Sequence, residues 1–138
     1  MRNKVKFLTE EGKRRLLSRH GIIYDKTTRN VLRVHNKNES WGHFLTKAVL
    51  YKLFRDKGYT VLLEAETAHG VIDVCILDLE LAIEVVSNPS PERIAQKKRM
   101  YSEFRDVLIV SYTPNQHANS MSFLYSSITS KKTFTYLT

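Results

Sequence analysis

The clearest hydrophobic pattern in this sequence is the stretch 71–88, VIDVCILDLELAIEVVSN, which is almost continuously apolar. A break at Asp78 and Leu79 divides it into two runs of strand length that are rich in Val, Ile and Leu. We therefore predict two neighbouring strands joined by a tight turn. If the turn is centred on Asp78 and Leu79, paired residues have numbers that sum to 157, and Asp73 lies opposite Glu84.

Asp73 and Glu84 are acidic residues inside otherwise apolar runs. Directly opposed side chains of a hairpin lie on one face of the sheet, with Cβ atoms about 4.5–5.5 Å apart. Two buried carboxylates at that distance repel each other and lose hydration. The pattern therefore favours a hard divalent cation such as Mg²⁺ between them. The alternative is that each acid has its own Arg or Lys partner in a structural ion pair.

The alternation of side chains along the two runs supports this register. The face opposite the carboxylates carries only large apolar residues, and the carboxylate face carries generally smaller ones. We expect the first face to pack a core and the second to leave room for a site. The first set is Ile72, Val74, Ile76, Leu81, Ile83 and Val85, and the second is Val71, Cys75, Ala82 and Val86.

A long helix is predicted before the hairpin, over residues 41–57. Ser40 is a suitable N-cap, and Gly58 is a typical C-terminal stop. The main apolar stripe of this helix is Trp41, Phe44, Leu45, Ala48 and Tyr51.

A polar stripe accompanies the amino end of the same helix. Glu39, His43 and Lys47 follow one another at i, i+4 and i+8, so they share a face. This stripe either converges on the metal or a phosphate, or is an exposed polar face. The acidic pair in the hairpin favours the first interpretation.

A second helix is predicted over residues 90–104, with Ser90 as N-cap and Pro91 at the first helical position. Its inward stripe is Ile94, Tyr101 and Phe104, and Lys97 falls within it. A lysine on the side facing the sheet is unusual. Either its stem packs and its amine reaches outward to solvent, or the amine reaches the site.

Four further segments complete the predicted α/β domain. Residues 59–67 and 106–113 are apolar strands, and the second of them implies a parallel crossover through the helix before it. Residues 121–128 form a possible short helix, and residues 131–137 alternate well enough for a final edge strand.

The N-terminal part is predicted to be a small basic extension. We divide the chain into residues 1–35, the extension, and residues 36–138, a single α/β domain. The extension contains a short helix over residues 7–19. It is followed by a small β-hairpin whose strands are residues 22–24 and 31–34.

Basic residues of this extension either contact phosphates or form a solvated face, and the sequence favours neither interpretation. The candidates are Lys13, Arg14, Arg15, Arg19, Arg29 and Arg33, to which we add Lys98 of the second helix.

Composition narrows the class of partner. The chain has 138 residues and a net charge of +8, from 22 Lys and Arg against 14 Asp and Glu, which favours a polyanion such as nucleic acid. No apolar run approaches the ~20 residues of a membrane span, and the first residues lack a signal-peptide core, so we expect a cytoplasmic protein without a membrane partner. The single cysteine, Cys75, excludes an internal disulfide and a cysteine-based zinc cluster.

The predicted order of elements, α-β-β-β-α-β, resembles the core of the PD-(D/E)XK nuclease superfamily, the restriction-endonuclease-like fold with a mixed central sheet flanked by helices. In that family an Asp begins the second strand and Glu-x-Lys follows on the third; Asp73 and Glu84 match the two acids. Residues 39–47 (ESWGHFLTK) resemble the first-helix signature of the competence-protein branch and of related phage, plasmid and archaeal-virus proteins. Residues 83–93 (IEVVSNPSPER) are similar to the IE-x-x-x-S-P-x-S stretch of these branches.

This resemblance covers residues 39–113 and implies a Mg²⁺- or Mn²⁺-dependent endonuclease that hydrolyses phosphodiester bonds in DNA. Asp73, Glu84 and the backbone carbonyl of Val85 would hold the metal. Glu39 or Glu64 would add a ligand or orient the attacking water. The resemblance also implies a homodimer, and a viral or mobile-element setting in the cytoplasm of a host cell.

One position departs from the family pattern, because Val86 stands where the motif has its lysine. Lys97 is the first candidate to replace it, since Lys97 and Tyr101 have the spacing of the Gln-x-x-x-Tyr motif of nucleases related to RecB. Lys47 is the second candidate, and His43 of the same stripe is a further catalytic candidate. The alternatives are a catalytically inactive nuclease-fold protein that binds DNA, and a protein–protein adaptor that uses the aromatic residues of the tail.

Overall fold

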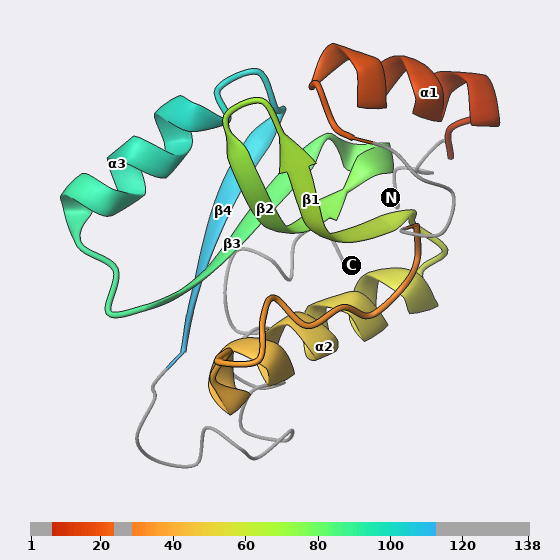
Figure 1. Cartoon of the computed structure of the whole chain (residues 1–138). Coiled ribbons are helices and arrows are strands. Elements are labelled where there is room, and N and C mark those ends of the chain that lie inside the picture. Colours follow the sequence, from red (N-terminus) through yellow and green to blue (C-terminus); the bar gives the residue numbers. More distant parts are fainter. Residues whose placement is uncertain (1–6, 24–28, 113–138) are drawn as a thin grey trace, which may run out of the picture.

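The computed structural model describes residues 7–23 and 29–112 and shows an α/β fold with a four-stranded sheet (Figure 1). In chain order, the elements are α1 (Glu10–Arg19), α2 (Trp41–Asp56), β1 (Val61–Thr67), β2 (Gly70–Ile76), the 3₁₀ turn η2 (Leu77–Leu79), β3 (Leu81–Ser87), α3 (Pro91–Met100) and β4 (Asp106–Tyr112). None of the described helices is long and apolar enough to cross a membrane.

The strands lie in the order β1-β2-β3-β4. The two pairs β1–β2 and β2–β3 are antiparallel, and β3–β4 is parallel, so the sheet is mixed. The predicted hairpin register is confirmed, because Val74 pairs with Ile83 and Ile76 with Leu81. The parallel crossover through α3 is confirmed as well.

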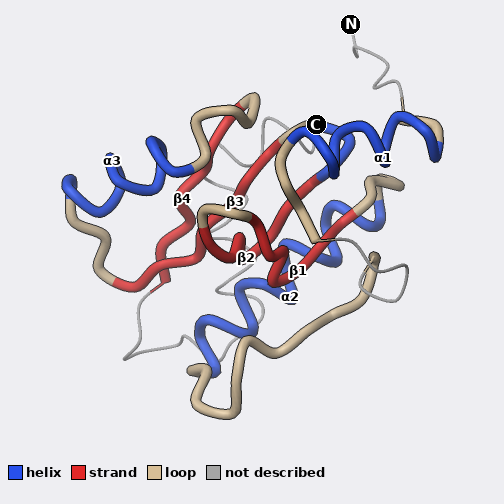
Figure 2. The backbone as a smooth tube through the Cα atoms, turned by 45° about the horizontal axis from the view of Figure 1, so that its top comes forward, coloured by secondary structure: helices blue, strands red, loops and turns tan. Residues whose placement is uncertain are grey.

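Two apolar clusters hold the sheet between its helices. α2 covers one face, and α1 together with the end of α3 packs toward the other (Figures 1 and 2). Each fully buried aliphatic or aromatic side chain contributes roughly 1.5–3 kcal/mol, so these clusters supply most of the favourable free energy of folding. The first includes Val49, Leu50, Phe54, Val61, Leu63, Val74, Ile76, Leu81 and Ile83, and the second includes Leu16, Leu17, Leu62, Ile72, Cys75, Ala82, Tyr101 and Phe104.

The regular alternation of the sheet is interrupted where Glu64 of β1 lies opposite Asp73 of β2. Glu64 has a φ of +53°, a left-handed conformation that is uncommon for a residue with a side chain. The β1–β2 ladder skips this pair, although the same register holds on both sides of it. As a result, the carboxylates of Glu64 and Asp73 both contact side chains of α2.

The predicted alternation is wrong at Ile72 because of this interruption. The residue packs with Cys75 in the second cluster, whereas Val74 and Ile76 lie in the first cluster as expected. The strict two-residue period fails because the backbone changes face at the Glu64–Asp73 position.

The helix boundaries follow the local signals in the sequence. The Ser40 hydroxyl accepts a hydrogen bond from the amide of His43 at 3.2 Å, and Gly58 after α2 has a φ of +90°. Both predicted signals of α2 are confirmed. α3 ends at Met100, four residues earlier than predicted, and the chain then turns so that Tyr101 and Phe104 enter the second cluster.

The apolar stripe predicted for α2 is wrong at Trp41, which is 69 % exposed. The side of α2 that is buried includes Thr46, Lys47, Leu50 and Phe54. The buried side of α2 therefore differs from the predicted apolar stripe, and it includes the charged residue Lys47.

Residues 7–23 pack onto the sheet rather than apart from it, since Leu16, Leu17 and Ile22 belong to the second cluster. Residues 31–34 are not a strand, so the predicted N-terminal hairpin is wrong there; Arg29 instead makes a bridge to Leu62 of β1. The predicted helix over residues 121–128 and edge strand over residues 131–137 lie outside the described residues.

Candidate functional site

A pocket of about 290 Å³ opens beside the β2–β3 hairpin, next to the pair formed by Val74 and Ile83. It is lined by side chains from α2, α3, β2, β3 and β4 and from the segment before α2. The lining residues are His35, His43, Val71, Asp73, Glu84, Val85, Val86, Ser87, Arg93, Lys97 and Tyr112. The two predicted acids therefore meet in one cavity.

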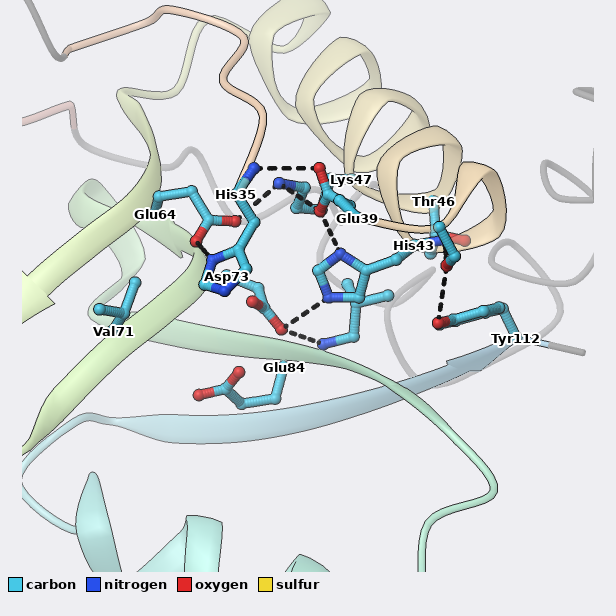
Figure 3. Close-up of polar contacts among 12 residues, drawn as sticks. His35, Glu39, His43, Thr46, Lys47, Glu64, Val71, Asp73, Glu84 and Tyr112 are labelled. Atoms are coloured by element: carbon cyan, nitrogen blue, oxygen red, sulfur yellow. Dashed lines mark hydrogen bonds and ion pairs between the residues drawn. The ribbon is translucent and has the colours of Figure 1, made fainter. Parts of the chain in front are cut away.

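Asp73 lies in the middle of β2, beside β3. Its Oδ2 atom accepts a hydrogen bond from the backbone amide of Val85 at 2.8 Å, and the same oxygen lies 3.5 Å from Nε2 of His43. Figure 3 shows the Asp73 carboxylate between His43 and Glu84. The side chains of Asp73 and Glu84 are only 14 % and 3 % exposed, so both acids are held largely out of water.

The two acids differ in protonation. Burial opposes ionisation of Asp73, but hydrogen bonds from His43, from Glu84 and from the Val85 amide outweigh it and lower the pKa of Asp73. The pKa of Glu84 is raised to about 8, chiefly by burial and secondly by the negative charge of Asp73. The positive charge of Lys97 offsets part of this rise. At neutral pH the pair thus carries one negative charge and retains one proton.

The Glu84 carboxyl has an unsatisfied oxygen. Its Oε1 atom is buried and has no hydrogen-bond partner among the described residues. The ammonium of Lys97 lies 3.6 Å from this oxygen, which is too long for a hydrogen bond. A buried orphan acceptor beside a second carboxylate is the chemistry that a hard cation would satisfy.

The residues present fit a divalent cation. Asp73, Glu84 and the Val85 carbonyl are oxygen donors of the kind that Mg²⁺ takes, and Mg²⁺ commonly uses one or two carboxylates and completes its shell with water and substrate oxygens. The described part of the chain contains no group of three or more His, Cys, Asp or Glu side chains suited to a metal. An ion here would therefore depend on the pair itself.

Behind the pocket, the side chain of Lys47 is fully buried in a charged network (Figure 3). Its ammonium lies 2.8 Å from Glu39 and 2.6 Å from Glu64, and it donates to the carbonyl of Arg33 at 3.0 Å. These contacts occupy all three of its N–H donors. The suggestion that Lys47 replaces the missing motif lysine is therefore corrected, because the amine has no donor left for a ligand.

The remaining oxygens of this network are also satisfied. Glu64 lies 2.7 Å from Nδ1 of His35, and Glu39 accepts from the His35 amide at 3.0 Å. Burial opposes ionisation of Glu39, but hydrogen bonds from Lys47, the His35 amide and His43 lower its pKa. Glu39 and Glu64 are thus engaged as partners of Lys47, and this arrangement gives no support to the idea that either is a metal ligand.

His43 connects this network to the acid pair. Its Nδ1 is hydrogen-bonded to Glu39, and its Nε2 faces Asp73. Burial opposes protonation of the ring, but the hydrogen bonds and charges of Asp73 and Glu39 raise the pKa of His43. The ring is therefore suited to fix the orientation of Asp73.

Two cationic side chains of α3 line the pocket. Lys97 is on the inner side of α3, as the sequence predicted, and Arg93 lies one turn before it. Val86, which stands at the position of the motif lysine, is buried and lines the same pocket. Lys97 is thus the described lysine nearest to the Glu84 carboxyl.

The basic residues of the N-terminal extension are not brought to this pocket. α1 packs beside η2, at the turn end of the hairpin (Figure 1). The two acids lie midway along β2 and β3. Several are paired, with Lys13 and Arg29 on Glu10, Arg15 on Glu11 and Arg19 on Glu80, while Arg14 and Arg33 are exposed. Lys98 is exposed on α3 beside Lys97.

Sequence reasoning missed four polar side chains that line the pocket: His35, Ser87, Arg93 and Tyr112. A signal for Arg93 was available, because it precedes Lys97 by four residues on the same helix. His35 and Tyr112 come from segments that only the folded chain brings near the hairpin, so no local pattern identifies them.

Comparisons with protein-family models, with curated proteins and with solved structures find no match to this chain. The functional assignment therefore depends on the geometry and chemistry of the site itself.

Proposed function

We propose that this chain is a divalent-cation-dependent endonuclease of the PD-(D/E)XK type that hydrolyses phosphodiester bonds in DNA. The observation that carries the proposal is the buried Asp73–Glu84 pair, with its orphan oxygen, in a pocket that also contains Lys97 and Arg93. An anionic pair alone would repel a phosphate. A cation on the pair together with two basic side chains makes the same pocket attractive to one.

Asp73, Glu84 and the carbonyl of Val85 would hold Mg²⁺ or Mn²⁺. When bound, such an ion lowers the pKa of a coordinated water and neutralises charge on the scissile phosphate. The chain's own residues do the rest. Lys97 and Arg93 bind phosphate oxygens and stabilise the added charge of the transition state, and His43 keeps Asp73 in position.

The DNA backbone would extend along the basic side of α3. Lys98 is exposed there, next to the pocket residue Lys97. With a net charge of +8, the chain would bind DNA with an affinity that falls as salt is added.

Cleavage assays test this function. Plasmid and oligonucleotide substrates are incubated with Mg²⁺ or Mn²⁺ and with wild type, Asp73→Asn or Glu84→Gln. Both substitutions keep the size of the side chain but remove a carboxyl group that can ionise to bind the cation, so we expect cleavage to be lost. Glu92→Gln, which alters an exposed carboxylate on α3, is the matched control and should cut like wild type. Equal cleavage by all four proteins would refute the assignment of the site.

A second candidate is a nuclease-fold protein that binds DNA without cleaving it. It is supported by Val86, an uncharged residue of the pocket at the position where the motif has its lysine. It predicts gel-shift binding with no cleavage under any divalent metal, unchanged by Glu84→Gln.

The proposed endonuclease also implies a homodimer, which would place two sites on two strands. Light scattering on the purified protein measures its mass directly.

A further inference from the structure

A second pocket, of about 420 Å³, lies at the amino end of α2 and is not used by the proposed chemistry. It is within the roughly 300–1,000 Å³ that is usual for small-ligand sites. Two of its apolar residues are strongly exposed, Trp41 at 69 % and Val34 at 59 %. The pocket is lined by Val34, Asn36, Lys37, Glu39, Trp41 and Phe44.

Trp41 has an aromatic face available for a ligand. Its ring centroid is 6.3 Å from that of Phe44, with an angle of 78° between the planes. A perpendicular contact of this kind covers at most one face of either ring. Phe44 thus supports the indole and leaves flat aromatic surface open for stacking.

This second pocket and the acid pocket share a wall. His35 lines the acid pocket, while its chain neighbours Val34 and Asn36 line the second one. Glu39 also links the two, because it lines the second pocket and its carboxylate is bonded to His43 of the first. The two pockets are therefore neighbours, with residues 34–39 between them.

The charge of the second pocket suits a nucleic acid. Lys37 is exposed in its lining, and the negative charge of Glu39 is compensated by Lys47 and His43. The pocket therefore offers an open aromatic ring and a cation, the combination on which bases of single-stranded nucleic acids stack. A base inside an intact duplex has no free face to offer.

We propose that the Trp41 pocket binds an unstacked nucleobase next to the phosphate held in the acid pocket, so that the substrate is single-stranded or locally unpaired DNA. This inference depends on the proposed function for the identity of the phosphate site. It adds a base-binding subsite and a class of DNA to that function.

Trp41 is the only tryptophan of the chain, so its fluorescence reports directly on this pocket. Oligo(dT), a duplex of the same length and an abasic sugar-phosphate oligomer are titrated in EDTA. Cleavage cannot occur there and the acid pair holds no cation for a phosphate, so the signal reports on the Trp41 pocket alone. We expect saturable quenching by oligo(dT) and at least several-fold weaker effects with the other two. Equal quenching by the duplex or the abasic oligomer would overturn the proposal, because contacts to the backbone would then explain the binding.

Variants separate stacking from folding. By anisotropy of labelled oligo(dT), Trp41→Ala should bind roughly 5- to 150-fold more weakly, the range for losing one stacked base. Trp41→Phe should recover most of the affinity, and Ile23→Ala, at a residue that is 68 % exposed elsewhere, should change nothing. Unchanged binding by Trp41→Ala, or a Trp41-dependent dimer without any effect on DNA binding, would contradict the subsite.

The two proposals fail in different ways. If oligo(dT) binding depends on Trp41 but no divalent metal supports cleavage, the endonuclease is refuted and the base subsite stands. If cleavage depends on Asp73 and Glu84 but Trp41→Ala binds and cuts single strands like wild type, the base subsite is refuted and the endonuclease stands.

Discussion

Two buried charged clusters lie next to each other in this protein, and they differ in how completely they are satisfied. Around Lys47, every donor of the ammonium has an acceptor, and both carboxylates are paired. Around Glu84, an oxygen is buried without a partner among the described residues, and the negative charge of Asp73 is close by. Complete pairing is what a structural network needs, whereas incomplete pairing at a pocket indicates a ligand.

His43 connects the two clusters. This histidine contacts Glu39 on the satisfied side and Asp73 on the unsatisfied side. The rigid network thus holds the acid that faces the pocket. A stable set of ion pairs supports a site that is itself electrostatically unfavourable until a cation binds.

The largest expected effect concerns the satisfied cluster. Lys47→Met leaves Glu39 and Glu64 buried without their cation, so we expect the free energy of unfolding to fall by about 3–5 kcal/mol. Urea denaturation followed by circular dichroism measures it. Lys97→Met, at a lysine that is 23 % exposed, should change stability by less than about 0.5 kcal/mol. Similar losses for both variants would remove the distinction between the clusters.

The second effect concerns the unsatisfied cluster and appears in the rate. Lys97→Ala removes a positive charge beside the acids, and we expect cleavage to slow by about 100- to 1,000-fold with stability little changed. Single-turnover cleavage measures the rate. Lys98→Ala, at the exposed neighbour, is the control and should lower DNA affinity more than rate. A normal rate for Lys97→Ala would exclude this lysine as the substitute for the one absent at Val86.

The third effect is a dependence of stability on pH. The pKa of Glu84 rises from about 4.5 in the unfolded chain to about 8 in the folded protein. The folded state therefore keeps a proton that the unfolded state releases, and stability without metal should fall as pH rises from about 4.5 to 8. Glu84→Gln should remove this fall and gain about 1–3 kcal/mol at pH 8. Thermal melting across this pH range is the measurement, and a flat wild-type profile would contradict it.

The smallest effect is a rescue. In the Lys97→Ala background, Val86→Lys returns a lysine to the motif position on the wall of the same pocket. We expect the double variant to cleave on the order of tenfold faster than Lys97→Ala alone. Val71→Lys, also on the pocket wall but on β2, is the positional control. If both lysines restore the rate equally, only the added charge and not the motif position matters.

The arrangement of the sheet was predictable from local signals. The hairpin register, the Ser40 cap and the crossover each depend on runs, caps and turns that neighbouring residues specify. Ile72 and Trp41 were predicted wrongly because their positions depend on distant parts of the chain. Ile72 changes sides at the interruption opposite Glu64, and α2 turns its Lys47 side inward toward partners that come from other segments.

The candidate site was predictable only in part for the same reason. The acid pair lies in one hairpin, and its meeting follows from a register that the hydrophobic pattern specifies. His35 reaches the pocket from the segment before α2 and Tyr112 from the end of β4, and their approach depends on the packing of α2 against the sheet. The family resemblance and the proposed activity stay predictions.

The central claim is that Asp73 and Glu84 together bind one divalent cation, and titration calorimetry with Mn²⁺ at pH 7 tests it most directly. Repeating the titration in buffers of different ionisation enthalpy counts the protons released. Because the pKa of Glu84 is about 8, we predict one binding site with release of close to one proton, and no binding by Asp73→Asn or Glu84→Gln. Binding that persists unchanged in both variants, or no binding by wild type, would contradict the claim.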